Sequence, residues 1–251
     1  MRARTALATI AGGALLAVGG AQATSGSGTA SCVVPQGAEH VRITPSQFTT
    51  RIDNPWWPMR PGSRWTYRET DPEGPTLRGV VTVTSNTKRV ADGVATRVVR
   101  DVARQGRTPV EVTNDYYAQD RCGNIWYFGE ATTEYRNGKP HSTEGSFEAG
   151  VDGAEPGVIL PARPRAGLGY RQEYYAGHAE DRGQVFSLGE QVETPYGHFG
   201  RGRVLMTRDL NPLEPDNLEY KFYVRGVGQV LAVAVSGGSD REELVGYQRG
   251  S

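Results

Sequence analysis

The sequence is short of cysteine, lysine and long apolar runs, and it contains none of the familiar catalytic motifs. It has no Gly-x-Ser-x-Gly elbow, no His-Glu-x-x-His pair and no glycine loop of the phosphate-binding kind. These absences count against the common hydrolases and metalloenzymes. The two cysteines do not have the spacing of a paired-cysteine metal site. After residue 18 no stretch approaches the ~20 apolar residues of a membrane-spanning helix.

The charges of the chain are balanced. It has 28 basic and 28 acidic side chains, and loss of residues 1–23 would leave a formal charge of about −2. Such a chain has no basic field to attract nucleic acid or an anionic membrane surface. We therefore expect neither as a partner, and nothing in the sequence predicts a cofactor.

Residues 1–23 have the pattern of a signal peptide. Arg2 and Arg4 give a positive start, Ala6 to Val18 is largely apolar, and Ala21-Gln22-Ala23 provides small residues at a cleavage site. An amino-terminal anchor helix is the alternative, but the apolar run is short and rich in glycine. We predict a secreted, extracellular protein whose mature chain begins at Thr24.

Cys32 has two competing uses. As one of two cysteines in an exported chain, it is expected to form a disulfide with Cys122 and close a loop of about ninety residues. Alternatively, Thr29-Ala30-Ser31-Cys32 faintly resembles the box at which bacterial lipoproteins are cleaved and acylated, which would make Cys32 a lipid anchor. The disulfide is favoured because Thr29 stands where leucine is usual and a Ser/Gly-rich spacer precedes Cys32.

Short strand-like runs bounded by turn residues begin at Phe48. Trp65 to Arg68 and Gly79 to Thr84 alternate, and Asn137-Gly138 is a strong hairpin signal. No window shows a convincing apolar stripe of helical period, although one or two short helices are expected around Pro45 to Thr50. We predict an all-β, mostly antiparallel fold of roughly ten strands, with few short helices, that forms a barrel or a strongly curved sheet.

The chain also contains an internal similarity with an offset of about 105 residues. Residues 61–69 are similar to residues 166–174, and residues 116–125 are similar to residues 222–230. Both copies have aromatic strands next to glycine turns. The similarity predicts a duplicated meander.

The predicted domain organisation follows from this repeat. A flexible leader over residues 24–40 precedes a single β domain over residues 41–251. That domain has two similar halves, at about 48–136 and 165–251, joined by an acidic Gly/Pro-rich loop over residues 137–164 that is placed to act as a lid.

Four segments resemble a family of uncharacterised exported bacterial proteins. They are Asp115–Asp120 (DYYAQD), Gly123–Glu130 (GNIWYFGE), Ser142–Ala154 (STEGSFEAGVDGA) and Tyr170–Tyr175 (YRQEYY). The similarity covers about residues 48–244. Because that family has no established activity, the resemblance implies export and a single integrated domain and assigns no catalytic role.

Acidic residues of the joining loop are the first candidates for chemistry. Glu144, Glu148 and Asp152 are candidate metal ligands because calcium takes six to eight oxygens, and two of them would serve as an acid–base pair. Their spacing matches no standard calcium loop. A solvated acidic loop partly paired with arginines is the alternative.

A second group follows the start of the second half. Glu173, Tyr174 and Tyr175 have the pattern of a ligand-binding rim, and His178 after them is a candidate general base or metal ligand. A surface turn with incidental charges is the alternative. The candidate catalytic residues of both groups are Glu148, Asp152, His178, Glu180 and Asp181. Trp56 and Trp57, between two prolines, are expected either to plug one barrel end or to stack on a ligand.

The leading functional hypothesis is a secreted small-molecule-binding protein with a cavity for an apolar or amphipathic ligand. The first alternative is a secreted enzyme, a hydrolase or a metabolite cyclase, that uses the carboxylates and His178. The second is a surface interaction protein without a ligand.

Overall fold

The computed structural model describes residue 32 and residues 34–251. The predicted signal peptide, residues 24–31 of the predicted leader and residue 33 lie outside the described residues. From Val34 onward the rest of the leader packs on the domain, because Pro35 O accepts a hydrogen bond from Arg171 N at 2.7 Å and Val34 is buried. Within the described part of the chain, no helix is long and apolar enough to cross a membrane.

The secondary structure is almost entirely β. The elements in chain order are η1 (Pro45–Gln47), β1 (Phe48–Thr49), β2 (Arg64–Thr70), β3 (Leu77–Arg89), β4 (Ala95–Gln105), β5 (Thr108–Asp120), β6 (Ile125–Arg136), β7 (Lys139–Ser142), β8 (Phe147–Glu148), β9 (Glu155–Leu160), β10 (Gly169–Arg171), β11 (Glu173–Tyr174), β12 (Arg182–Thr194), β13 (Gly197–Leu210), β14 (Leu218–Val224), β15 (Gly228–Ser236) and β16 (Arg241–Gln248). The all-β prediction is confirmed, with 16 strands rather than roughly ten.

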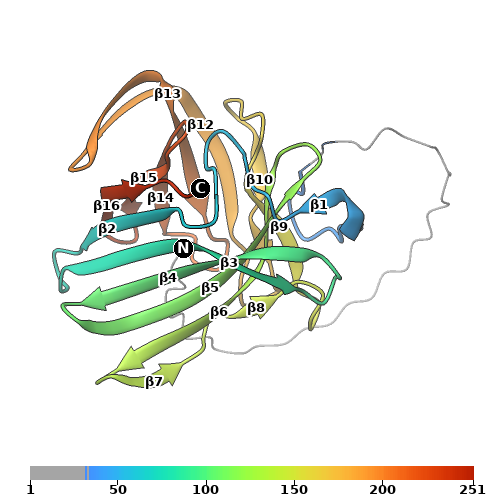
Figure 1. Ribbon diagram of the computed structural model, residues 1–251, viewed down its shortest axis with the longest axis horizontal. Helices are drawn as coiled ribbons and strands as arrows, with labels where there is room; N and C mark the ends of the chain where they lie inside the picture. The colour runs from blue at the N-terminus through green and yellow to red at the C-terminus, as the bar shows by residue number, and fades with distance from the viewer. Residues whose placement is uncertain (1–31, 33) are drawn as a thin grey trace.

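The strands form a nearly closed antiparallel barrel (Figure 1). The order of neighbours is β10-β12-β13-β14-β15-β16-β2-β3-β4-β5-β6-β9-β11. β10 pairs with β12 and β11 pairs with β9, although a single residue, Gln172, separates β10 from β11. One short segment therefore bridges the first and last strands of the sheet.

Both halves of the barrel use the same order of neighbours. Consecutive strands pair from β2 to β6 and again from β12 to β16, while β16 also pairs with β2 and β9 pairs with β6 and β11. This arrangement is what a duplicated meander produces. That the halves arose by duplication stays a prediction.

The acidic segment 137–164 differs from the loop expected there. It contains β7, β8 and β9, and all three pair with β6. Because these strands are hydrogen-bonded along the barrel wall, the segment extends the wall. The expected short helix is the single 3₁₀ turn η1.

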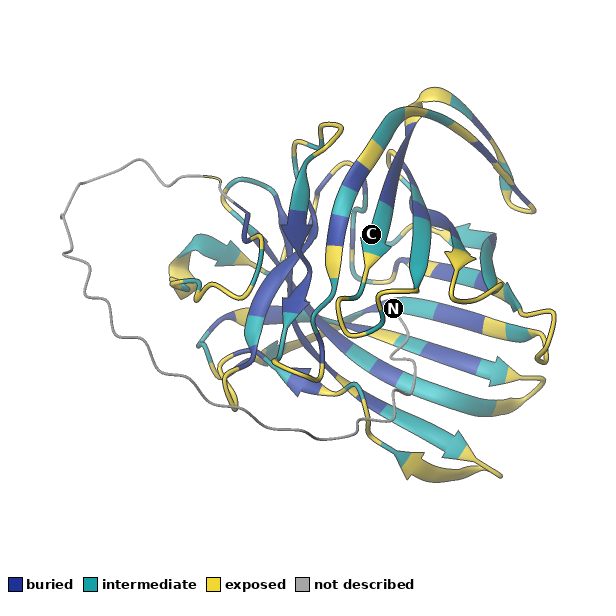
Figure 2. Ribbon diagram, turned by 180° about the vertical axis from the view of Figure 1, so that it is seen from behind, coloured by how far each residue is buried: buried dark blue, intermediate teal, exposed yellow. Residues whose placement is uncertain are grey.

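Strand alternation decides which side chains enter the barrel. On β14, Lys221 and Tyr223 are buried at alternate positions, and on β5 Thr113, Asp115 and Tyr117 are buried in the same way. Figure 2 shows that burial is greatest along the middle of the sheet and falls toward the hairpin ends. The inner face therefore carries polar and aromatic residues together.

Aromatic side chains pack together at one end of the barrel. The Trp57 ring packs against Trp65, Tyr117 and Tyr223, with ring centroids 6.5, 6.1 and 5.7 Å away. The bent β12–β13 hairpin covers the same end, where Tyr196 N donates to Leu244 O at 3.1 Å. That Trp56 and Trp57 stack on a ligand stays a prediction.

Candidate functional site

The inner wall formed by β5 and β6 carries two carboxyl groups joined by a tyrosine. Tyr127 Oη lies 2.9 Å from Asp115 Oδ1 and 2.6 Å from Glu130 Oε2. Thr132 Oγ1 donates to the other oxygen of Glu130 at 3.1 Å. Because Tyr127 has one hydroxyl proton, it donates to one carboxyl while the other must carry its own proton to bond to it.

A glycine bulge makes this arrangement possible. Tyr127 and Glu130 are three residues apart, so a regular strand would direct them to opposite faces. Gly129, with φ at 128°, and the register shift opposite it move both side chains to the inner face. A Cβ at Gly129 would lie 2.2 Å from Phe147 O, so no larger residue fits.

The opposite wall, β13 and β14, contributes a buried ion pair. Lys221 Nζ lies 2.5 Å from Asp209 Oδ2 and 3.2 Å from Glu219 Oε2. Asp209 Oδ2 also accepts a hydrogen bond from Gln172 Nε2 at 3.0 Å, and Thr207 Oγ1 donates to Oδ1 at 3.2 Å. The lysine and the amide therefore converge on one carboxylate.

Carboxyl groups from the remaining strands extend this charge around the interior. Gln229 Nε2 donates to Glu242 Oε1 at 2.8 Å on the β15–β16 side. We call the whole set the interior acidic cluster. It consists of Glu69, Asp101, Asp115, Glu130, Glu173, Asp181, Asp209, Glu219 and Glu242, which act electrostatically on one another and on Lys221.

Exposure along β14 shows from which side solvent reaches the cluster. Tyr223 is 1% exposed, the Lys221 side chain 7% and the Glu219 side chain 33%. Glu219 lies next to the β13–β14 turn, at the end of β14 opposite Tyr223, whose ring packs against Trp57. Along β14 the side chains thus pass from a buried tyrosine through a nearly buried lysine to a partly exposed glutamate.

Burial sets the protonation of the cluster. It raises the pKa of Glu173 and Asp115 well above their usual values, with the charges of Asp181 and Glu130 adding to the effect. Burial also raises the pKa of Asp181 to about 7, although Lys221 opposes the shift. Burial therefore favours the neutral form of these carboxyls.

Lys221 behaves differently. Burial opposes its charge, but the carboxylates of Asp209 and Glu219 outweigh burial and raise its pKa well above the usual value. A lysine that stays protonated is a fixed cation and a poor nucleophile.

Glu242 provides a test of this electrostatic environment. Burial and then the neighbouring Glu69 raise its pKa from 4.5 to about 8. The folded state therefore binds an extra proton between pH 4.5 and pH 8, and the stability this gives is lost as pH rises through that window. Glu242→Gln keeps an acceptor for Gln229, so we expect a Tm close to that of the wild type at pH 4.5 and about 5 °C higher at pH 8.

The next residue supplies a control of opposite sign. Burial of Glu243 favours its neutral form, but hydrogen bonds from Arg68 at 2.7 Å and Arg241 at 2.8 Å outweigh it and lower the pKa. Glu243→Gln should lower the Tm at pH 7 and have little effect at pH 3. Thermal unfolding across pH checks both variants, and a Glu242→Gln difference that does not grow with pH would contradict the assignment.

Two of the residues predicted from the sequence, Glu173 and Asp181, belong to the interior acidic cluster. Glu173 is buried, and its backbone N donates to Asp181 O at 3.3 Å. Tyr174, Tyr175 and His178, which were predicted with Glu173, lie outside the interior acidic cluster. Tyr175 stacks on the exposed His178 ring with centroids 4.4 Å apart, and Tyr174 lies under the guanidinium of Arg171.

Glu180 and Trp56 also lie away from the interior acidic cluster. Glu180 accepts a hydrogen bond from Gly177 N at 2.9 Å. The guanidinium of Arg225 lies over the Trp56 ring, 4.7 Å from its centroid. Neither residue is brought to the carboxyls of the barrel.

The predicted metal ligands are not brought together. Glu148 pairs with Lys88 at 2.6 Å and accepts from Ala91 N, while Glu144 and Asp152 are exposed. Among residue 32 and residues 34–251, no group of three His, Cys, Asp or Glu side chains is arranged to hold a metal ion.

Sequence reasoning missed most of the interior acidic cluster and its lysine. A usable signal was present, because Glu219, Lys221 and Tyr223 alternate along one strand, as do Asp115 and Tyr117. Alternate charged positions are usually interpreted as the solvent-facing side of a sheet. In a barrel with a polar interior the same pattern marks the inner face.

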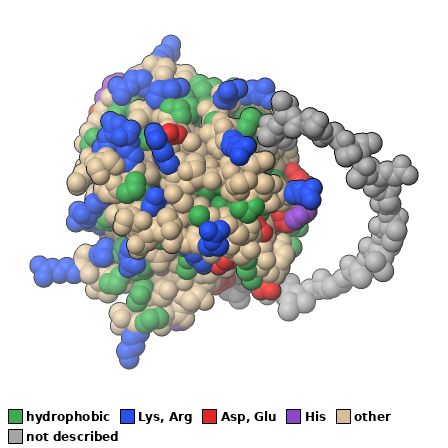
Figure 3. All heavy atoms as spheres, turned by 45° about the vertical axis from the view of Figure 1, so that its right-hand side comes forward, with side chains coloured by type: hydrophobic (Ala, Val, Ile, Leu, Met, Phe, Trp, Pro, Cys, Tyr) green, Lys and Arg blue, Asp and Glu red, His purple; other side chains and the backbone are tan. Residues whose placement is uncertain are grey.

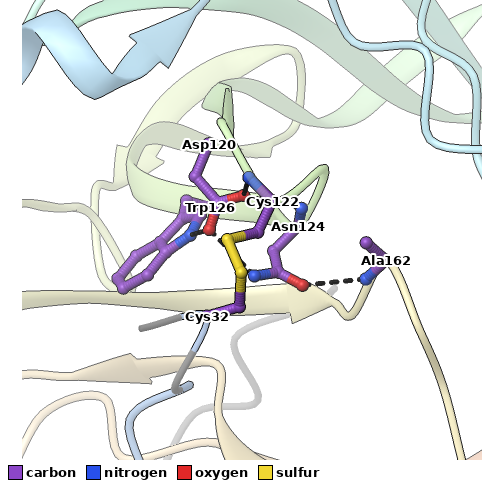
Figure 4. Close-up of a disulfide and its surroundings, with 6 residues drawn as sticks. All are labelled: Cys32, Asp120, Cys122, Asn124, Trp126 and Ala162. Carbon is purple, nitrogen blue, oxygen red and sulfur yellow. Dashed lines mark hydrogen bonds between the residues drawn. A yellow bond between two sulfur atoms is a disulfide. The ribbon is translucent and has the colours of Figure 1, made fainter. Parts of the chain in front are cut away.

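The predicted disulfide between Cys32 and Cys122 is present, with Cα atoms 5.8 Å apart (Figure 4). The turn that carries Cys122 is held by Asp120, which accepts from Cys122 N at 2.8 Å and from Trp126 Nε1 at 2.8 Å. Disulfides are typical of proteins outside the reducing cytosol. A sulfur in this bond cannot also carry a lipid.

Two cavities lie away from the interior acidic cluster. One, of about 570 Å³, is beside the disulfide and includes Arg163 and Arg165 in its lining. The other, of about 300 Å³, lies near Arg97 and Ser251. On the face shown in Figure 3, Lys and Arg side chains are widespread and few carboxylates are visible. On this face the surface charge is thus mainly basic, whereas the interior holds the interior acidic cluster.

The fold and the interior define an all-β, nearly closed barrel with a polar lining. Comparison with known proteins adds little to this class. No protein-family model matches the chain, and no curated protein matches it. One crystal structure, of a "putative lipoprotein" from Parabacteroides distasonis, is similar with a TM-score of 0.40 and 12% identity, over 77% of this chain and 98% of that one. Similarity at this level does not establish a common function.

Proposed function

We propose that this is an exported protein that binds a small amphipathic molecule inside its barrel. The observation that carries the proposal is the layering of the interior, from the aromatic floor at Trp57 and Tyr223 through Lys221 to the partly exposed Glu219. A ligand with an apolar end and a polar end matches that order. Concave sites that combine aromatic walls with a few polar groups are typical of small-molecule binding.

The charged layer favours an amphipathic ligand over a purely apolar one. Asp209 and Lys221 are both at most 10% exposed in their side chains. An alkyl chain packed against them would remove this charged pair further from water without adding a hydrogen bond, which is costly. Export enters the proposal through the signal-peptide pattern of residues 1–23, and the disulfide supports it.

Mass spectrometry tests the proposal directly. Residues 24–251, exported from a bacterial host, should show a mass excess of a small organic molecule under native conditions that disappears on denaturation. The excess should be smaller or absent in Glu173→Gln, because Glu173 lies in the interior acidic cluster. A wild-type protein that binds nothing, natively or from a metabolite extract, would contradict the proposal.

Residues outside the barrel interior supply matched controls. His178→Ala and Asp152→Asn change exposed side chains, so both should retain the mass excess. Chemical conversion of the bound molecule during incubation would instead indicate that the protein is an enzyme, with Glu173 and Asp181 as its acid–base groups.

A further inference from the structure

The larger of the two cavities, of about 570 Å³, lies where the disulfide joins the leader to the domain. Its apolar lining comes from the leader, from the disulfide and from the segment between β9 and β10. The residues concerned include Val34, Pro161, Leu168 and both cysteines. A concave, largely apolar surface of this size is within the range of small-molecule sites.

Two arginines give this cavity its charge. Arg163 and Arg165 both line it, and they flank Pro164 in the sequence. A proline has a fixed φ and favours an extended conformation for the residue before it. Side chains two residues apart in extended backbone point to the same side. The sequence Arg-Pro-Arg therefore presents both guanidinium groups, which we call the arginine pair, to one cavity.

Hydrogen bonds hold the segment of the arginine pair at both ends. Ala162 N donates to Asn124 Oδ1 at 2.8 Å, beside the disulfide (Figure 4). At the other end, Gly167 N donates to Val185 O and Val185 N donates to Leu168 O, each at 2.9 Å. The backbone that carries the arginine pair is thus fixed by the protein itself, which lowers the entropy cost of binding a ligand.

The arginine pair has no counter-charge within the described part of the chain. Both residues are exposed, and neither guanidinium has a hydrogen bond or an ion pair with a described residue. No described residue that lines the cavity carries a carboxyl group. Residues 1–33 contain no Asp or Glu, so they have no carboxylate side chain to offer. The cavity therefore combines an apolar wall with two positive charges that have no partner in the protein.

These features select an anionic head group joined to an apolar body. Guanidinium groups bind the oxygens of carboxylate, sulfate and phosphate groups through paired N–H donors. The amide of Asn124, also in the lining, is already used, because its Oδ1 accepts from Ala162 N and its Nδ2 donates to Asp120 Oδ2 at 2.8 Å. The arginine pair is thus the main source of free donors, and it would repel a cation.

We propose that the cavity beside the disulfide binds a small amphipathic anion. Its carboxylate, sulfate or phosphate group contacts Arg163 and Arg165, and its apolar part packs on Val34, Leu168 and the disulfide. This site is separate from the barrel interior, so the inference goes beyond the proposed function. It also gives the disulfide a second role, because the bond fixes Cys32 in the wall of the cavity.

Calorimetry with three eight-carbon probes tests the charge requirement. Octanoate should bind, while uncharged octanol and cationic octylamine should bind at least about tenfold more weakly. Acetate, which has the same head group and almost no apolar body, should also bind at least about tenfold more weakly than octanoate. The affinity for octanoate should fall severalfold between about 20 mM and about 500 mM salt, because salt screens exposed charges. Octyl sulfate and octyl phosphate then compare the head groups.

Removal of the arginine pair tests the assignment of residues. Arg163→Gln/Arg165→Gln should weaken octanoate binding at least about tenfold. Its Tm should stay within about 2 °C of the wild type, because both side chains are exposed. Arg107→Gln/Arg136→Gln is the matched control, since these exposed arginines lie in the β4–β5 turn and at the end of β6. That control should bind octanoate as the wild type does.

The outcomes separate this inference from the proposed function. Equal binding of octanol or octylamine, or no binding of octanoate below about 1 mM, overturns the amphipathic-anion assignment. Unchanged affinity in Arg163→Gln/Arg165→Gln does the same. Binding to anionic phospholipid vesicles without binding to octanoate would assign the arginine pair to a membrane contact and overturn the cavity site. Glu173→Gln should retain octanoate binding, so its effect on the native mass excess tests the barrel interior alone.

Discussion

Replacing Lys221 with methionine should lower the free energy of unfolding by about 3–5 kcal/mol near pH 7. Lys221 is nearly buried, and its Nζ contacts both Asp209 and Glu219. Without it, Asp209 is a buried carboxylate within a group of other carboxyls. The wild-type contribution persists across the neutral range, because a lysine whose folded-state pKa is raised stabilises the protein below its ordinary pKa and loses that effect only as pH rises further.

Chemical denaturation at several pH values checks this prediction. Asp209→Asn in the same chain should restore part of the stability, because it removes the carboxylate that would otherwise be left buried without its counter-charge. Lys139→Met is the matched control, since Lys139 is exposed on β7, and it should change stability by less than about 0.5 kcal/mol. Equal effects of the two lysine variants would show that Lys221 is not a buried counter-charge.

The second large effect is expected from the disulfide. Cys32 and Cys122 are 90 residues apart in sequence, and on the chain-entropy account a loop of that size contributes about 4–5 kcal/mol. The double variant Cys32→Ser/Cys122→Ser should therefore unfold at a Tm lower by about 10 °C or more. Cys32 is three residues before Pro35, whose carbonyl pairs with Arg171 N.

Reduction provides the control for this comparison. Dithiothreitol should lower the Tm of the wild-type protein toward that of the double variant and leave the double variant unchanged. Denatured mass measurement adds an independent readout, because reduction of one disulfide adds two hydrogens. A wild-type mass that already corresponds to two thiols, or to a lipid on Cys32, would show that the bond does not form in the exported protein.

Charge segregation links these predictions to function. The balanced total of 28 basic and 28 acidic side chains gives no hint that acidic groups gather inside the barrel. The barrel separates the charges, because alternate residues of each strand face opposite sides. Burial then raises the pKa of carboxyls such as Asp115 and Glu173.

The sequence by itself determined the class of fold, the disulfide and the approximate positions of many strands. Alternation, glycine turns and Asn137-Gly138 are local signals, and two cysteines allow a single pairing. It also pointed to Glu173 and Asp181. The number of strands was underestimated because β8 and β11 have two residues each, and such strands exist only where a neighbour supplies their hydrogen bonds.

Only the tertiary structure decided which residues share the interior. Asp115, Glu173, Asp209 and Glu242 are distant in sequence and meet because the sheet closes through β10 and β11. The Gly129 bulge then turns Glu130 inward. The alternation of residues along a strand specifies two faces of the sheet. Whether the charged face contacts water or the opposite wall of the barrel depends on closure of the sheet. Closure is a long-range property of the whole sheet.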